Sequence, residues 1–231
     1  MNRSATLSKA RSVAVPRSLP RVPRVLQAGF WLCIVIGIAV VLRRALALWR
    51  PLTTSAPPDL LRLDTFFKTH TILTYVHIFA ALVFVCVLPF VFWSRTRAST
   101  MVRLLFYTVG TIVGFSAFAM VVHPVGGAIE GAAVIFYDGL FLVSLAYSCS
   151  AWKMGQTEKS LRWTLRATAI SLGIATTRPV MGIFFATSRL THWTPEQFFG
   201  PAFWVGFSIN TLVMELWLRK HPLFSQRRWH E

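Results

Sequence analysis

Long apolar runs alternate with short basic, polar or proline-containing links along most of this chain. A helix needs about 20 mainly apolar residues to cross the hydrocarbon core of a bilayer. Six runs reach this length, at about residues 25–48, 70–93, 102–122, 131–152, 163–188 and 200–218. The pattern therefore predicts an all-α fold, a polytopic transmembrane bundle of six spans.

Charge supports a membrane protein and predicts its orientation. The 231 residues are 55% hydrophobic, with 24 Lys and Arg against 8 Asp and Glu, a net charge of +16. A basic balance is also typical of nucleic-acid-binding proteins. Here, however, most basic residues lie at the ends of the apolar runs, and the link after the third run has none. Because cytoplasmic loops are enriched in Lys and Arg, we expect both termini in the cytoplasm of a bacterial inner membrane, with lipid and no nucleic acid as partner.

The segments outside the spans give the domain organisation. Residues 1–24 carry serine, proline and basic residues without an apolar period, which predicts a basic cytoplasmic tail. The six-span membrane domain follows at 25–220, and a second cytoplasmic tail at 221–231. Between the first two spans, residues 51–68 contain Pro-Pro-Asp followed by leucines and phenylalanines. We expect this segment to lie along the outer membrane interface.

Three ionisable residues fall deep inside predicted spans. His77, Asp138 and Arg178 each lie several residues from the outer end of their span. At about 1.5 Å per residue, the three converge on one level in the outer half of the membrane. Ionisable groups in hydrocarbon are costly and usually functional. We expect Asp138 and Arg178 to be charge partners and His77 to titrate beside them. A structural polar cluster that fixes helix packing is the alternative.

A second group of polar residues lies nearer the outer surface, namely His70, His123, Glu130 and His192. Histidines at one height on different helices can ligate a metal ion or haem. His70, His123 and His192 are therefore candidate ligands, although histidine is also common at membrane interfaces. The three cysteines show no spacing typical of a thiolate metal site.

Two polar residues, Asn210 and Glu215, lie on the sixth predicted span near its inner end. Glu215 precedes Arg219 by four residues, an ordinary helix pair. It could instead meet a basic residue of a neighbouring span and lock two helices together. Both residues are weak candidates for a binding role.

The order of several short motifs resembles a known family. These motifs are "THTILTYVHIFAALVFVCVLPFVF", "HPVGG", "RWTLRATAI", "TTRP" and "SINTLVMELWLRK", spread over about residues 66–220. They are similar to the bacterial membrane proteins of the domain-of-unknown-function 2306 family. The resemblance implies a polytopic membrane fold and no established activity.

The resemblance also implies which residues are typical of the family. These are His77, Trp163, Arg166, Arg178, Asn210 and Glu215. Two typical histidines are absent, because the third span opens with Val102-Arg103 and Ser160 stands near the Arg-Trp pair. A role that depends on those imidazoles as metal or haem ligands would be altered here.

Three classes of function fit these observations. The first is a membrane enzyme that acts on a lipophilic small molecule, with His77 or Asp138 as proton donor or acceptor and Arg178 orienting the substrate. The second is a haem- or metal-handling redox protein that uses the outer histidines. The third is a noncatalytic carrier or assembly partner. The sequence names no substrate.

Overall fold

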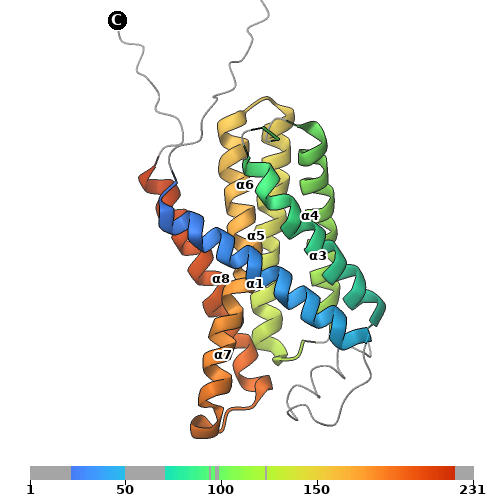
Figure 1. Cartoon of the computed structure of the whole chain (residues 1–231), viewed down its shortest axis with the longest axis vertical. Coiled ribbons are helices and arrows are strands. Elements are labelled where there is room, and N and C mark those ends of the chain that lie inside the picture. Colours follow the sequence, from blue (N-terminus) through green and yellow to red (C-terminus); the bar gives the residue numbers. More distant parts are fainter. Residues whose placement is uncertain (1–21, 50–70, 94, 97–98, 123, 222–231) are drawn as a thin grey trace, which may run out of the picture.

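The chain folds into helices packed in one bundle (Figure 1). The structure is a computed structural model that describes residues 22–49, 71–93, 95–96, 99–122 and 124–221, without the side chains of residues 48 and 189. The described helices are α1 (Arg24–Trp49), α3 (Thr71–Phe92), α4 (Thr100–Met120), α5 (Gly127–Lys153), α6 (Thr157–Ser171), α7 (Gly173–Thr191) and α8 (Pro195–Lys220). The predicted interfacial segment 51–68 and nearly all of both predicted tails lie outside the described residues.

Five segments of the described chain are long and apolar enough to cross a membrane. Four are α1, α3, α4 and α5, and the fifth combines α6 and α7 over Thr157–Ser188. The protein is thus a multipass helical membrane protein. Helix α8 overlaps the sixth predicted span and has 26 residues, but it is not among the five.

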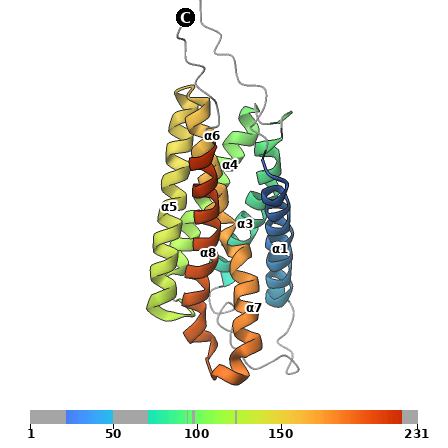
Figure 2. The ribbon, with the colours of Figure 1, turned by 90° about the vertical axis from the view of Figure 1, so that its left-hand side faces the viewer.

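The helices of the bundle lie side by side, with α1 as an oblique outer layer (Figures 1 and 2). Helix α1 contacts α3 and α7, whereas α5 contacts α4, α6 and α8. Helices α7 and α8 form a hairpin that returns the chain along α6 and α5. A capping box of Thr194 and Gln197 begins α8 immediately after the turn, which satisfies N–H groups that would otherwise be unpaired.

Aromatic packing and close backbone approach hold the bundle together. The ring of Phe84 on α3 stacks on Phe106 at 5.2 Å and meets Phe141 edge-on at 5.6 Å. Gly110 allows α4 to approach both neighbours, since a Cβ there would lie 2.8 Å from Phe84 and 2.9 Å from Leu145. In lipid, where apolar tails surround the helices, small residues of this kind permit the close van der Waals packing that favours helix association.

A buried network of hydroxyl groups joins α4, α5 and α6. The Ser148 hydroxyl lies 3.0 Å from the Tyr107 hydroxyl and 2.7 Å from that of Thr164. Thr164 in turn donates to the backbone carbonyl of Ser160 at 2.9 Å. All four side chains are buried, so these bonds satisfy groups that would be costly to leave unpaired in an apolar interior.

The start of α1 lies against the end of α8. Val22 and Leu26 pack on a buried cluster of Leu161, Trp217 and Leu218. The first and last described helices therefore meet at the end of the bundle where α6 begins. The start of α1 and the end of α8 therefore lie at the same end of the bundle.

Candidate functional site

The three deep ionisable residues of the sequence line one cavity of about 270 Å³. His77 reaches it from α3, Asp138 from α5 and Arg178 from α7. Most of the remaining wall is apolar, including Phe84, Phe141, Phe203 and Phe207. We call this space the His77 cavity. It combines an apolar wall with a few converging polar groups, the usual make-up of a small-molecule site.

The His77 ring is held by a hydrogen bond to α4. Its Nδ1 lies 2.9 Å from Ser116 Oγ, and that hydroxyl donates to the Val113 carbonyl at 2.9 Å. Because the single hydroxyl hydrogen is used for Val113, Ser116 Oγ accepts from His77 and the ring hydrogen is assigned to Nδ1. The other nitrogen, Nε2, is left as an acceptor. This arrangement assigns the hydrogen on Nδ1 and holds the ring on the cavity wall.

Asp138 makes no hydrogen bond or ion pair to any described residue. Its Oδ2 is buried, and no described donor or acceptor reaches it. The α5 helix begins at Gly127, four residues before the predicted start of that span, so Asp138 lies about 16 Å along the helix. A buried carboxyl oxygen without a partner is rare in native proteins. The oxygen is therefore available to a hydrogen-bond donor that enters the cavity.

Arg178 does not form the ion pair with Asp138 that we expected from the sequence. No described atom accepts from its buried Nε, and its Nη1 donates only to the Met181 sulfur at 3.6 Å. The negative charge that acts on Arg178 is that of Glu130, while Arg43 and Arg44 repel it. Equal depth in the membrane did not make the two residues partners, because depth along a helix does not determine which neighbouring helix a side chain faces.

Glu130 has a local structural role as well as a place on the cavity wall. Its Oε2 accepts from the backbone N–H of Gly126 at 2.5 Å, and the residue lines the His77 cavity. The carboxylate therefore pairs a free N–H at the start of α5, where negative charge also suits the helix dipole. Helix α5 begins four residues before the predicted span, and the last of these four residues is Glu130, which makes this hydrogen bond.

Arg44 is a cavity residue that the sequence analysis did not select. It lies on α1, lines the His77 cavity and is half-buried, whereas Arg43 beside it is exposed. The signal was present, since two arginines follow an apolar run before α1 ends. Long arginine side chains near a span end usually extend to the interface. This tendency favoured an interfacial position for Arg44, whereas the residue lines the cavity.

Of the three outer histidines, the structure describes only His192. His70 and His123 lie outside the described residues. His192 is exposed at the end of α7, in a left-handed conformation with φ of 56°. Among the described residues, no group of three or more His, Cys, Asp and Glu side chains could hold a metal ion. The proposed metal role of these histidines stays a prediction.

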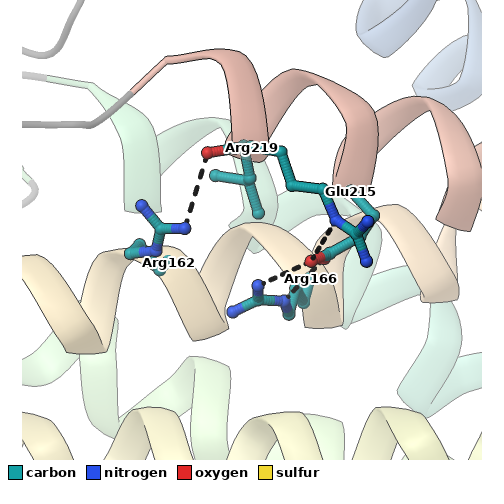
Figure 3. A network of polar contacts seen from close by, with 5 residues as sticks. Arg162, Arg166, Glu215 and Arg219 are labelled. Carbon is teal, nitrogen blue, oxygen red and sulfur yellow. Dashed lines mark hydrogen bonds and ion pairs between the residues drawn. The ribbon is translucent and has the colours of Figure 1, made fainter.

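Glu215 is paired across helices with Arg166 (Figure 3). Arg166 Nε donates to one carboxylate oxygen at 2.9 Å and Nη2 to the other at 3.0 Å. The guanidinium also lies over the Trp163 ring, 4.7 Å from its centroid. Arg219 is more distant from Glu215, at 3.8 Å. Of the partners considered for Glu215, Arg166 makes the two-bond contact that fixes orientation best.

Asn210 lies on the same helix and also joins it to α7. Thr176 Oγ1 donates to the Asn210 side-chain oxygen at 2.7 Å. Cys33 of α1 lies 3.8 Å from the same threonine hydroxyl. Asn210 is therefore part of a link between helices, and it does not line the His77 cavity.

No model of a known protein family, no curated protein and no solved structure matches the chain. The described chain is that of a multipass helical membrane protein with a buried hydroxyl network.

Proposed function

We propose that this protein is a membrane enzyme whose His77 cavity binds a lipophilic small molecule with a polar head and exchanges a proton with it. His77 and Asp138 act as the candidate proton acceptor and donor, and Arg178 orients the head. The observation that carries this proposal is the pair of buried, unpartnered atoms on one cavity wall, Asp138 Oδ2 and Arg178 Nε.

The polar groups support complementary roles. Arg178 can only donate hydrogen bonds, so its free Nε requires an acceptor atom. The Nε2 of His77 is an acceptor in the assigned tautomer. Asp138 donates when protonated and accepts when ionised. Side chains of this kind within reach of a bound head group are the usual participants in general acid–base catalysis.

The apolar wall supports a lipophilic substrate. Phenylalanines of α3, α5 and α8 surround the polar groups. Burying apolar surface against them contributes about 25 cal/mol per Å². A small ionic solute would gain no binding free energy from this wall. An amphiphilic molecule would gain it from the apolar wall through its chain and from the polar groups through its head.

We further propose six spans with both ends in the cytoplasm. Support comes from the contact of α1's start with α8's end, because five crossings would leave those ends on opposite faces. The 26 residues of α8 extend about 39 Å, enough to cross. Basic residues Arg24, Arg162, Arg219 and Lys220 gather at this end, where the positive-inside rule expects them.

Membership of the domain-of-unknown-function 2306 family, and a place in the bacterial inner membrane, stay predictions from the sequence. Neither changes the chemistry proposed for the cavity. His77 and Arg178 match residues typical of that family, and both also line the cavity in the structure.

The proposal is tested by the lipophilic molecules that copurify with the protein. Wild type, Asp138→Asn and Arg178→Met are purified from the membrane of expression, and bound molecules are extracted and quantified by mass spectrometry. Glu158→Gln and Arg24→Met, which change like charges outside the cavity, are the matched controls. We expect a bound compound to be depleted about tenfold or more in the cavity variants, since a hydrogen bond to a charged group contributes about 1.5–3 kcal/mol.

Equal amounts of the same compounds in all five proteins would contradict binding at the His77 cavity. Recovery of the bound compound in the same chemical form from wild type and from every variant would contradict the catalytic part of the proposal. In that case the cavity binds without reacting, as a carrier would.

A further inference from the structure

A second cavity of about 210 Å³ lies between α5, α6 and α8. Its wall includes Leu140, Trp163, Ala169 and Met214, together with Arg166 and Glu215. We call it the Glu215 cavity. Its position relative to the His77 cavity and the state of its polar groups together indicate what it holds.

The two cavities are neighbours that share lining from α5, α6 and α8, and their residues alternate along α5. On α5 the wall passes from Asp138 and Phe141 in one cavity to Leu140 and Ser144 in the other. On α8 it passes from Phe207 to Thr211, one turn further. Only Ile170 lines both cavities among the described residues. Its side chain is buried, and because it lines both spaces we infer that it separates them.

The charged groups of the Glu215 cavity and its Thr211 hydroxyl already have partners. Arg166 and Glu215 bond to each other, and the Thr211 hydroxyl donates to the Phe207 carbonyl at 2.8 Å. This cavity offers little to a polar group, in contrast to the unpartnered atoms of the His77 cavity. An apolar chain suits the Glu215 cavity, and a polar head suits the His77 cavity.

We propose that the ligand is a single-chain amphiphile whose neutral head carries both a hydroxyl and a carbonyl, and that Ile170 limits the length of its chain. The inference rests on the proposed function of the His77 cavity. The head hydroxyl meets Asp138 and the carbonyl accepts from Arg178. The chain extends toward the Glu215 cavity and ends against Ile170.

The test uses glycerol monoesters of octanoic, dodecanoic and octadecenoic acid as probes. Their thermal stabilisation of the purified protein is titrated for wild type, Ile170→Val and Ile170→Ala, because a ligand that binds the folded state raises the unfolding temperature. The matched control is Ile174→Ala. Ile174 lines only the His77 cavity, so its truncation adds space there without opening the partition.

We expect wild type to bind the shortest ester best. Ile170→Ala should bind a longer ester about tenfold more tightly than wild type does, as two further buried methylenes would give. Ile170→Val should shift the preference part of the way, and it remains informative if the alanine variant folds poorly. Ile174→Ala should keep the wild-type order of chain lengths.

An unchanged order of chain lengths in both Ile170 variants would overturn the inference while leaving binding at the His77 cavity intact. The same shift in Ile174→Ala would overturn it too, because the effect would then come from volume alone. Failure of every ester to stabilise any variant would reject this ligand class. The copurification experiment decides separately whether the His77 cavity binds a lipophilic molecule.

Discussion

His77 on α3 and Ser116 on α4 are joined by a hydrogen bond of 2.9 Å between Nδ1 and Oγ. Since the serine hydroxyl donates to Val113, the bond assigns the ring hydrogen to Nδ1. Ser116 therefore orients the His77 ring on the cavity wall. A histidine in an otherwise apolar span thus has one ring nitrogen bonded to the neighbouring helix through Ser116.

The first prediction concerns His77. His77→Ala should abolish binding of the copurified compound yet leave folding near normal, because the ring lies on a cavity wall and its loss exposes little unpaired polarity. His77→Asn should also fold and fail to bind, since its amide can still donate to Ser116 but cannot reproduce Nε2. Size-exclusion profiles, unfolding temperatures and quantified bound compound are the readouts. If His77→Ala mainly destabilises the protein and His77→Gln restores both stability and binding, the histidine is a packing residue.

The second prediction separates the two carboxylates near Arg178. Glu130→Gln and Arg178→Met should be coupled, because the Glu130 charge acts on Arg178. Asp138→Asn and Arg178→Met should be close to additive, because no ion pair joins them. Groups that interact show coupling of about 0.5–3 kcal/mol in double-mutant cycles. Denaturant unfolding in detergent measures both cycles, and stronger coupling for Asp138 would restore the direct pair expected from the sequence.

The third prediction concerns the Arg166–Glu215 pair. Glu215→Gln should destabilise the protein, because it removes the carboxylate that accepts both Arg166 bonds. Partly exposed ion pairs contribute about 1 kcal/mol at most, so we expect a coupling of about that size in a cycle with Arg166→Met. The corresponding cycle of Glu215→Gln with Arg219→Met should give less, given the longer 3.8 Å contact. Thermal unfolding of the variants provides the measurement, and equal coupling in the two cycles would contradict the preference for Arg166.

The fourth prediction tests the contact between α7 and α8. A Cβ added at Gly206 would collide with the backbone of Thr177, 2.6 Å away. Gly206→Ala should therefore separate the helices and destabilise the bundle, by about 1–3 kcal/mol as overpacking usually does. At Gly182 on α7 a Cβ meets open space, so Gly182→Ala is the control and should be neutral or stabilising. Equal unfolding temperatures for the two variants would show that α7 and α8 lie further apart than described.

The fifth prediction is topology. A reporter fused after Arg228 should be active only if it functions in the cytoplasm, and one inserted at the turn before Pro195 should be active only if it functions outside. The opposite responses follow from α8 crossing the membrane between the two points. A periplasmic signal after Arg228 would contradict the proposed orientation. The same response at both points would mean that α8 does not cross the membrane.

Hydropathy located a helix at each predicted apolar run, although it did not reveal the break at Leu172 between α6 and α7. A segment in lipid must satisfy its own backbone groups, so a long apolar run can only be a helix. Counting residues from the span ends also brought His77, Asp138 and Arg178 to one level, and the cavity does contain all three. Both results depend on length and composition, which a sequence displays directly.

The rotation of each helix about its axis was decided by the tertiary structure. In a membrane the lipid-facing and the buried faces are both apolar, so periodicity does not distinguish them. The sequence therefore paired Arg178 with Asp138, whereas the folded chain forms no such pair and places Glu130 and Arg44 on the wall of the same cavity. The place of Ile170 between two cavities likewise depends on three packed helices, because no local pattern encodes which side chain will fill the space between them.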